Sequence, residues 1–298
     1  MNGRILPASR ARVSIFDHSF LYGDGIYETV RAYGCRLFRW PEHDRRLRRS
    51  ARRIRLACPW SSSFLRDAAQ RLLRANREPN GSVRITISRG PGPLGLDPAV
   101  CPKPTVAMML HPGRDGERLR RHGVSIGIPR VRRNPPESLD PRIKSNNGLN
   151  IILAKLEARR LGVFECVLLN RHGRLTEGTT SNIFFIRGRA LYTPALSCGL
   201  LEGVTRAAVV RLARAAGYRV VEGAYRPEHL KAADEAFLTS TTLEIVPIVR
   251  LVEYGAGTSR FRSTSIGGGR PGSLTVRLHQ LFRDEVRAEM KRELAGLL

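Results

Sequence analysis

Lys144 is the residue of this chain whose type stands out most against its surroundings. Of the 51 lysines and arginines among the 298 residues, only five are lysines. An arginine keeps its proton and cannot form an imine, whereas a lysine in a desolvated, cation-rich pocket can lose its proton and attack a carbonyl carbon. Lys144 lies in the turn-prone segment PRIKSNNGLN, directly before an expected helix. A lysine kept there indicates covalent chemistry; chance and simple solvation are the alternative explanations.

Glu177 and two hydroxyl-rich turns are the other candidates for chemistry. Glu177 lies in LTEGTTSN, where it is either an ordinary turn residue or a carboxylate that faces a ring nitrogen. In LLEGVTRAA, Val204 and Thr205 open an expected helix, so free backbone N–H groups and a hydroxyl could bind a phosphate. A plain helix cap is the alternative explanation for Thr205. The second turn, TSTTLE, contains Ser240 and Thr241 and is a further candidate for binding phosphate.

A lysine, a carboxylate and two turns of this kind together match the needs of pyridoxal phosphate. This cofactor requires a lysine that forms a Schiff base, an acid that keeps its pyridine nitrogen protonated, and a cradle for its phosphate. Each residue alone has an ordinary explanation. Their combination predicts a site for this cofactor.

The elements that must position these residues follow from periodicity and capping. Apolar residues that alternate predict strands, and apolar residues at spacings of three and four predict helices. The expected strands are 26–33 and 35–40, paired as a hairpin around Gly34, then 82–88, 105–110, 124–128, 165–169, 181–186, 218–222 and 235–239. The expected helices are 41–56, 64–76, 147–161, 204–216 and 274–297.

This mixture of hairpins and helices predicts an α/β (α+β) fold with mixed sheets, and the length fits two domains. We place the boundary in the polar segment 111–123, which gives an N-terminal α/β domain over 1–118 and a cofactor-binding α/β domain over 119–298. The run GPGPLG at 90–95 matches G-x-G-x-x-G, but a dinucleotide site needs a helix directly after it. The prolines that follow forbid such a helix, so we expect a loop.

The net charge of +25 invites a second interpretation, a basic nucleic-acid-binding protein. The densest basic run is RRLRRSARRIR at 45–55, where Leu47, Ala51 and Ile54 recur at spacings of four and three. That pattern is typical of an amphipathic helix with a solvated basic face. The other arginines are spread along the whole chain. We therefore expect an arginine-rich surface without a specific nucleic-acid site.

Composition also bears on location and on metals. The first 25 residues contain no apolar run long enough for a signal peptide or a membrane helix. The five cysteines are scattered and form no C-x-x-C pair, which predicts reduced thiols in a cytoplasmic protein. The seven histidines show no metal-ligand spacing, so we expect no metal site.

Six segments, in order, resemble the fold-type IV (class IV) pyridoxal-phosphate enzymes. This family includes branched-chain and D-amino acid aminotransferases, certain (R)-amine transaminases and aminodeoxychorismate lyase. The segments lie between Ser14 and Gly272 and are YGDGIYETVRAY, PEHDRRLRRSA, IKSNNGLNIILAKLEA, LTEGTTSNIFF, GLLEGVTRAAV and ADEAFLTSTTLEIVPI. The resemblance implies a two-domain enzyme with the cofactor in the interdomain cleft, and a homodimer.

The resemblance also implies a role for each matching residue. Lys144 would be the catalytic lysine that forms the Schiff base, Glu177 would pair with the pyridine nitrogen, and Leu201 would pack on the ring. The remaining cofactor-binding residues would be Arg46 from the EHxxRL pattern, Val204, Thr205, Ser240 and Thr241. The substrate would meet Tyr27, Arg84 and Thr242.

Several positions bear on the substrate. The lyases tend to carry a threonine where this chain has Glu28, which favours a transaminase. Arg84 falls where branched-chain enzymes have an arginine that could meet a substrate carboxylate. The D-amino acid enzymes place an arginine and a histidine in the loop where this chain has Leu94 and Leu96, yet TSTTLE and TEGTTSN are closer to those enzymes. Gly148 replaces the tyrosine of KSLNYLN found in many relatives, and it is the clearest departure from the family pattern.

We therefore expect a transaminase that exchanges the amino group of an amino acid with a 2-oxo acid. A branched-chain-like L-amino acid is the favoured substrate. A D-amino acid aminotransferase and an aminodeoxychorismate-lyase-like enzyme remain alternatives with the same fold.

Overall fold

The computed structural model describes residues 1–113, 116–255 and 261–296. The chain divides into two compact units. Unit 1 comprises 1–114, 143–148 and 288–298, and unit 2 comprises 115–142 and 149–287. The segment that carries Lys144 therefore belongs to unit 1, although we had assigned it to the second domain. Within the described ranges, no helix combines the length and apolar character needed to cross a membrane.

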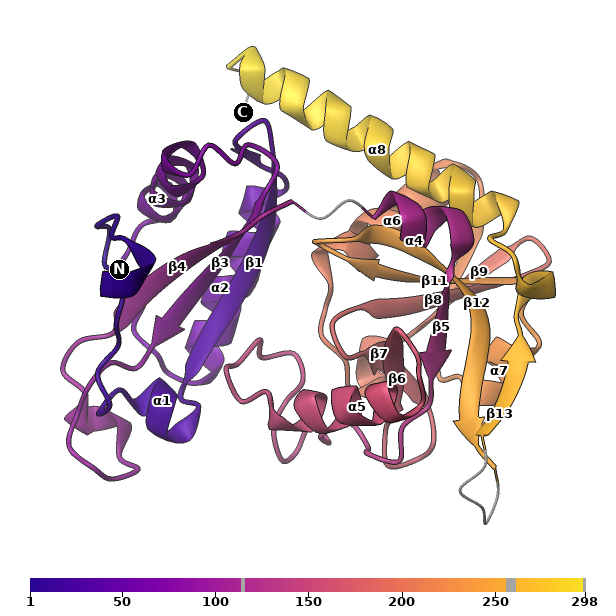
Figure 1. The fold of residues 1–298 in the computed structure, drawn as a ribbon, viewed down its shortest axis with the longest axis horizontal. Helices are drawn as coiled ribbons and strands as arrows, with labels where there is room; N and C mark the ends of the chain where they lie inside the picture. Colours follow the sequence, from indigo (N-terminus) through magenta and orange to yellow (C-terminus); the bar gives the residue numbers. More distant parts are fainter. Residues whose placement is uncertain (114–115, 256–260, 297–298) are drawn as a thin grey trace. The chain divides into compact units, whose positions relative to one another are not determined.

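Unit 1 contains an antiparallel sheet of four described strands in the order β2-β1-β3-β4 (Figure 1). The strands are β1 (Gly25–Tyr33), β2 (Arg36–Leu37), β3 (Ser82–Ser88) and β4 (Thr105–His111). The helices are α1 (His18–Tyr22), α2 (Trp40–Arg53) and α3 (Ser62–Ala75), with short 3-10 turns at Ala8–Arg10 and Pro98–Val100. Helix α2 packs on β1, and α3 packs near β2 and β4.

The core of unit 1 forms because alternate residues of β1 and one face of each helix are apolar. Ile26 and Val30 of β1 are fully buried, and Leu47 of α2 is buried in the same cluster. The Ser61 side chain caps α3 by accepting a hydrogen bond from Phe64 N (3.1 Å). The apolar periodicity of α2 and α3 thus places most of their arginines away from the sheet, whereas Arg46 of α2 is buried against β1.

Unit 2 contains a mixed sheet of nine described strands in the order β10-β9-β8-β11-β12-β5-β6-β7, with β13 beside β12. The first strands are β5 (Val124–Gly127), β6 (Glu165–Leu169), β7 (Leu175–Gly178), β8 (Asn182–Arg187) and β9 (Ala190–Pro194). The others are β10 (Arg219–Gly223), β11 (Glu235–Ser240), β12 (Glu244–Tyr254) and β13 (Phe261–Ser265). Strand β5 is parallel to β12 and β6 is parallel to β5, while β11 is antiparallel to both of its neighbours, β8 and β12.

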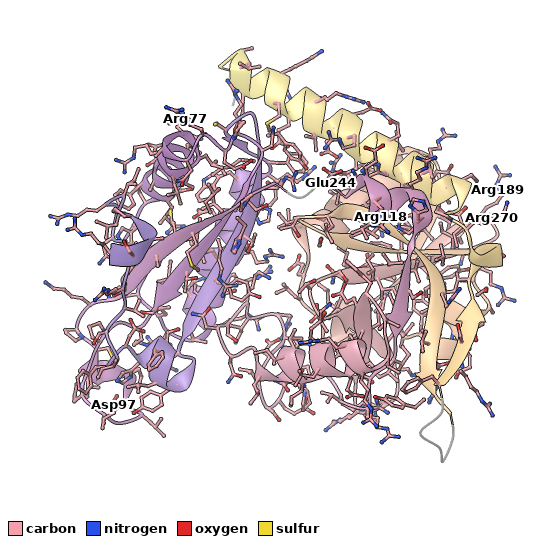
Figure 2. The ribbon with its side chains drawn as sticks, in the orientation of Figure 1. Arg77, Asp97, Arg118, Arg189, Glu244 and Arg270 are labelled. Carbon is pink, nitrogen blue, oxygen red and sulfur yellow. The ribbon has the colours of Figure 1, made fainter. Side chains whose placement is uncertain are left out.

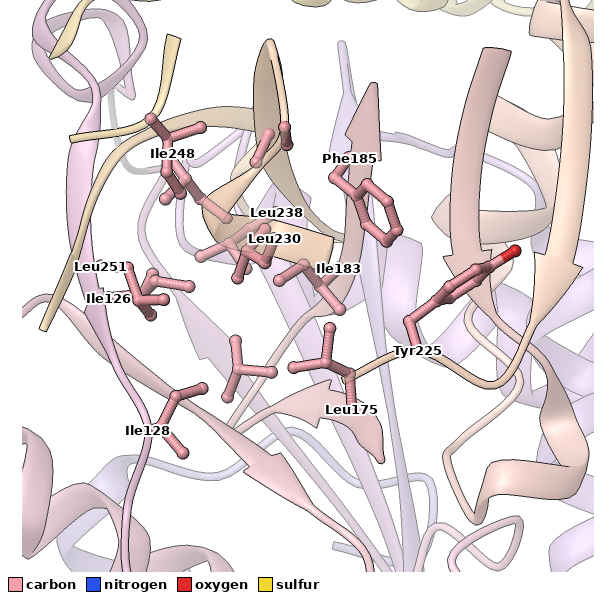
Figure 3. Packing of buried hydrophobic residues seen from close by; sticks show 14 of the residues in the cluster. Ile126, Ile128, Leu175, Ile183, Phe185, Tyr225, Leu230, Leu238, Ile248 and Leu251 are labelled. Carbon is pink, nitrogen blue, oxygen red and sulfur yellow. The ribbon is translucent and has the colours of Figure 1, made fainter. Parts of the chain in front are cut away.

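The helices of unit 2 flank this sheet. They are α4 (Glu117–His122), α5 (Leu149–Arg160), α6 (Val204–Ala215), α7 (Pro227–Lys231) and α8 (Ser273–Leu294), with 3-10 turns at Leu196–Cys198 and Gly267–Gly269. Residues 288–294 of α8 are assigned to unit 1. Figure 3 shows the main core, in which Ile183 and Leu238 pack with Leu175 and Ile126 from strands far apart in sequence. Phe184 and Phe237 stack on one another with ring centres 5.0 Å apart.

The mixed α/β architecture is confirmed, and most expected elements occur within a few residues of their expected bounds. The expected end of the last helix at 297 lies outside the described residues. The expected strand 35–40 is wrong in length, because only Arg36–Leu37 pair with β1 before α2 begins at Trp40. Strands β7, β9, β12 and β13 were not expected, since neither alternation nor turn residues distinguish them. The loop after β3 contains only the 3-10 turn Pro98–Val100, as its prolines require.

A buried ion pair joins β1 to α2 in unit 1. Arg46 Nε donates to Glu28 Oε2 (2.8 Å) and Arg46 Nη2 donates to Glu28 Oε1 (2.6 Å). His43 Nδ1 lies 3.1 Å from Glu28 Oε1, and all three side chains are buried. Separating the two groups would leave each charge buried without a counter-charge, which is strongly unfavourable. The pair therefore fixes how α2 packs on β1.

The ion pair also sets the protonation of its members. Burial alone would raise the pKa of Glu28, but the charge of Arg46 and the neighbouring His43 outweigh burial and hold that pKa well below its ordinary value. Burial lowers the pKa of His43, and the Glu28 charge only partly offsets this effect. Acid therefore acts on both groups in the same direction, because protonating either one disfavours the folded state.

We expect Glu28→Gln to lower the free energy of unfolding by about 3–5 kcal/mol near neutral pH, because Arg46 would stay buried without its counter-charge. A depressed carboxyl pKa gives stability that is fully present above the ordinary value of 4.5 and is lost as pH falls below it. The difference between wild type and Glu28→Gln should therefore shrink as pH falls below that value. Urea denaturation at several pH values measures it.

Glu42→Gln is the matched control, since Glu42 lies on the same helix in a partly exposed ion pair with Arg39. This substitution should cost less than about 1 kcal/mol at any pH. An equal loss in the two variants would contradict the central role of the buried pair.

Candidate functional site

The loop that carries Lys144 is held to unit 1 by backbone hydrogen bonds. Tyr27 N of β1 donates to Lys144 O (2.9 Å), and Asn146 N donates to Gly25 O (2.8 Å). Lys144 N donates to Ser50 Oγ of α2 (3.1 Å). The lysine is therefore anchored to both elements that the Glu28–Arg46 pair joins.

The Lys144 amine lies against an aromatic ring that it shares with a second cation. Its Nζ is 4.5 Å from the centre of the Tyr27 ring, and the guanidinium carbon of Arg84 is 3.6 Å from the same centre. Both cations are stabilised by the negative face of the ring. The Lys144 charge, helped by Arg84, lowers the pKa of Tyr27 although burial opposes this shift. Three residues expected at the site, Tyr27, Arg84 and Lys144, are thus brought together.

Asn146 connects Arg84 to the lysine loop. Arg84 Nη2 donates to Asn146 Oδ1 (3.3 Å), and Arg84 Nε donates to Thr86 Oγ1 (3.3 Å). Asn146 Nδ2 in turn donates to Ser19 Oγ (2.8 Å). Asn146 had not been identified from the sequence, where only its place two residues after Lys144 could have indicated a role.

Arg46 was expected to bind phosphate, and in unit 1 it is engaged with Glu28. A guanidinium has five N–H donors, and the two hydrogen bonds to Glu28 use one from Nε and one from Nη2. A phosphate bound by Arg46 would therefore share this side chain with Glu28. From the sequence, Glu28 served only to distinguish a transaminase from a lyase, and its pairing with Arg46 was not expected.

Glu177 of unit 2 lies on β7 and is buried. Arg133 Nε donates to its Oε1 (2.8 Å), and Leu201 N donates to its Oε2 (3.0 Å). Glu177 and Leu201, both expected at the site, are therefore in contact. Arg133 had not been identified from the sequence, because nothing separates it from the many other arginines. Each carboxylate oxygen can accept a further hydrogen bond.

The turn after Leu201 is closed by Asn182. Asn182 Nδ2 donates to Leu201 O (3.1 Å), and a Cβ added to Gly203 would lie 2.0 Å from Asn182 Oδ1. Only glycine fits there. The following helix, α6, begins at Val204 without a side-chain cap, so its first N–H groups are donors available to an anion. Thr205 is the second residue of that helix.

Ser240, Thr241 and Thr242 lie at the turn between β11 and β12. Leu243 N donates to Ser240 Oγ (3.2 Å). The turn ends at Glu244, which has a left-handed φ of 63° and is buried. Glu244, labelled in Figure 2, accepts hydrogen bonds from Arg283 Nη1 (2.7 Å) and lies 2.7 Å from His279 Nε2, both on α8.

A second buried carboxylate shapes the segment after Glu177. Glu165 accepts hydrogen bonds from the side chains of Thr179 (2.9 Å), Thr180 (3.1 Å) and Ser181 (2.9 Å), and from the backbone N–H of Thr180. These bonds fix the turn that follows β7. An acidic residue inside the apolar strand FECVLL is a signal that could have revealed this role.

Gly148, the clearest departure from the family pattern, is not required by the backbone. Its φ lies outside the left-handed region, and a Cβ added there would meet no atom closer than Asn146 O at 3.9 Å. A Cβ would therefore fit at this position, four residues after Lys144, without a close contact.

Curated relatives match the chain along nearly its whole length. A putative branched-chain-amino-acid aminotransferase of Methanocaldococcus jannaschii is 36% identical over 95% of this chain and 94% of its own. An aminodeoxychorismate lyase of Bacillus subtilis is 35% identical, with 89% of this chain and 90% of its own covered. A D-alanine aminotransferase of Bacillus licheniformis is 30% identical over 97% and 96%.

Solved structures agree with these relatives. The branched-chain amino acid aminotransferase of Escherichia coli has a TM-score of 0.87 at 29% identity, covering 95% of this chain and 92% of its own. The enzyme of the same name from Thermobaculum terrenum, in its PLP form, has a TM-score of 0.81 at 29% identity, over 96% and 92%.

The family model for amino-transferase class IV matches residues 25–251, which include β1, the Lys144 loop, Glu177 and both hydroxyl-rich turns. Enzymes of this family use pyridoxal phosphate. The chain contains the kinds of group that this cofactor needs: within unit 1, Lys144 has a primary amine, and within unit 2, Glu177 is a buried carboxylate and α6 has an uncapped start. The chain is a member of the class IV aminotransferases.

Proposed function

We propose that this enzyme is a transaminase in which Lys144 bonds pyridoxal phosphate. The observation that carries the proposal is the position of the Lys144 amine within unit 1, beside Tyr27 and anchored to β1 and α2. When bound, the cofactor supplies an aldehyde for the amine and a ring that accepts electrons from the substrate. Lysine is the basic side chain that can perform this step, since an arginine stays protonated.

Lys144 has two tasks in this proposal. Its amine would hold the cofactor covalently, because a deprotonated lysine amine is the nucleophile that can condense with an aldehyde with loss of water. Once free again, the same amine carries the proton that leaves the α-carbon of the amino donor. The hydrogen bond from Lys144 N to Ser50 Oγ keeps the backbone in place while the side chain moves.

The other residues bind and orient. In this proposal Glu177, held by Arg133, accepts a hydrogen bond from the protonated pyridine nitrogen, and Leu201 packs on the ring. The phosphate receives hydrogen bonds from the start of α6 and from the hydroxyls of the β11–β12 turn, with Arg46 adding a positive charge. The residues assigned to the phosphate are Arg46, Val204, Thr205, Ser240 and Thr241. Tyr27, Arg84 and Thr242 are assigned to the substrate.

A branched-chain-like L-amino acid is the substrate that we favour, with a 2-oxo acid as acceptor. The relative from Methanocaldococcus jannaschii is named a putative branched-chain-amino-acid aminotransferase. In this proposal the positive charge of Arg84 binds the substrate carboxylate. Leu94 and Leu96 are exposed in the loop where D-amino acid enzymes place charged side chains. Because other relatives are a D-alanine aminotransferase and an aminodeoxychorismate lyase, D-amino acid transamination and an aminodeoxychorismate-lyase-like activity remain the alternatives.

We also propose that the enzyme is a cytoplasmic homodimer. Helix α5 of unit 2 exposes Leu149, Ile152, Leu153 and Leu156, which form one stripe. Unit 1 separately exposes Phe16, Phe20, Leu94 and Leu96. Contiguous exposed apolar patches of this kind favour association, and a second copy of the chain is the partner that the family suggests. The five free cysteines suit a reducing compartment.

Lys144→Ala should reduce transamination by more than the ~10²–10⁴-fold usual for loss of acid–base assistance alone, because its covalent role is lost too. Wild-type protein incubated with pyridoxal phosphate should show a visible absorbance band that borohydride abolishes, and the variant should not. Lys103→Ala is the control, since Lys103 is an exposed lysine of the same unit. Normal turnover by Lys144→Ala would refute the proposal. A colourless protein that binds DNA specifically at physiological salt would support the nucleic-acid alternative.

Arg84→Gln should lower kcat/KM for L-leucine by roughly 10–100-fold, mainly through KM, because a charge-assisted hydrogen bond to the substrate carboxylate is lost. Amine donors without a carboxylate should be affected much less. Arg71→Gln, which removes an exposed arginine of α3, should behave as wild type. Comparing L- and D-leucine on the wild type tests the substrate: faster reaction of the D form would overturn our preference.

The dimer predicts a particle of twice the mass of one chain in light scattering. Replacing Ile152 and Leu156 together by Glu should shift the mass to that of a single chain, because charges would enter an apolar contact. Val276→Glu changes an equally exposed apolar residue of α8 and should leave the dimer intact. Dissociation by the Val276 variant alone would place the interface elsewhere.

A further inference from the structure

Within the basic run at 45–55, only Arg46 and Ser50 have a part in the proposed reaction. Helix α2 turns Arg46 and Leu47 toward β1, where both are buried. Arg45, Arg48 and Arg52 recur at spacings of three and four, so they share the opposite side of the helix. On that side the structure contains a pocket of about 550 Å³ between the length of α2 and the start of α3, with all of its lining residues between 40 and 66 in unit 1.

The pocket is strongly cationic. Arg45, Arg48, Arg52 and Arg66 line it, and Asp44 is the one acid among its lining residues. One oxygen of that acid is engaged, because Arg48 Nε donates to Asp44 Oδ2 (2.9 Å), whereas Asp44 Oδ1 is buried and accepts no hydrogen bond from the described residues. Within the described residues, the side chains of Arg45 and Arg52 make no hydrogen bond or ion pair. Like charges gathered in a concavity repel one another, and a bound anion relieves that repulsion.

Hydroxyl donors line the same pocket. Ser62 Oγ accepts a hydrogen bond from Trp40 Nε1 (3.0 Å), so its own O–H proton can be donated elsewhere. Ser63 also lines the pocket, at the first turn of α3. Arginine forks together with serine hydroxyls form the donor set that binds phosphate oxygens.

The size and the walls of the pocket indicate more than an inorganic ion. Trp40 and Pro41 provide an apolar wall. A volume of about 550 Å³ lies within the roughly 300–1,000 Å³ range of small-molecule sites and leaves room for an organic group beside the charge. The exposed arginines Arg77, Arg118 and Arg189, labelled in Figure 2, are not part of the pocket lining.

We propose that this pocket is a second anion site, separate from the Lys144 site, which takes a phosphate monoester about the size of a sugar phosphate. Arg45 and Arg52 bind the phosphate, Ser62 and Ser63 donate to its oxygens, and the organic group lies against Trp40 and Pro41. A monoester carries a charge near −2 at neutral pH, which matches a pocket with four arginines and one aspartate.

Isothermal titration of the full-length protein, preloaded with pyridoxal phosphate and reduced with borohydride, tests the proposal at 0.15 M salt. The probes are ribose 5-phosphate, inorganic phosphate and ribose. Ribose 5-phosphate should bind more tightly than phosphate, and ribose should not bind. The double variant Arg45→Gln/Arg52→Gln should weaken ribose 5-phosphate binding by about tenfold or more, because two charge-assisted contacts are lost.

The matched control is Arg53→Gln/Arg55→Gln, which removes the same charge from exposed arginines of the same segment outside the pocket. It should leave the dissociation constant within about twofold of wild type, since these side chains are exposed, do not line the pocket and are partly screened by water and salt. Thermal unfolding of both variants checks that each is folded. Equal weakening in the two variants would mean general charge attraction and overturn the proposal. Absence of ribose 5-phosphate binding to wild type, or binding of longer polyanions only, would overturn it too.

Discussion

The ion pair between Glu28 and Arg46 is the constraint on which the surroundings of Lys144 in unit 1 depend. Both groups are out of water, so neither can move without leaving the other's charge uncompensated. The pair joins β1 to α2. The Lys144 backbone is bonded to both elements, because Lys144 O accepts a hydrogen bond from Tyr27 N of β1 and Lys144 N donates one to Ser50 Oγ of α2. The place of the amine therefore follows from a carboxylate that need not touch the substrate.

Unit 2 uses buried carboxylates in a similar way. Glu177 gathers Arg133 and the backbone of Leu201, while Glu165 gathers the hydroxyls of the turn that follows Glu177. Each acid satisfies several donors at once, so short polar segments hold one conformation without apolar packing of their own. Preorganised donors are what a charged cofactor requires, because they need not rearrange when it binds.

The sequence predicted those features that depend on residues close together in the chain, namely motif residues and elements with a regular apolar pattern. Tyr27, Arg84 and Lys144 meet around one ring, and Glu177 meets Leu201, as their family positions suggested. The long amphipathic helices and the alternating strand β1 could be predicted because their patterns are local.

What the sequence could not provide was pairing between residues far apart. Arg133 is one arginine among many until the fold brings it to Glu177, and Glu28 shows its charge partner only when β1 and α2 pack. Strand β9 likewise gives no clear pattern alone, because its buried residues are defined by its neighbours β8 and β10. Burial of a charge is a property of the packed chain, so sequence spacing cannot reveal it.

Glu244, which has a left-handed backbone conformation, depends on residues that are synthesised much later than itself. Its charge partners, His279 and Arg283, lie near the end of the chain, whereas the hydroxyl-rich turn that it closes lies some forty residues earlier. On the ribosome that turn is made well before its anchor emerges. Glu244 therefore gains its two partners only after α8 has been made, and a chain released short of α8 would carry Lys144 and Glu177 but would leave Glu244 without His279 and Arg283.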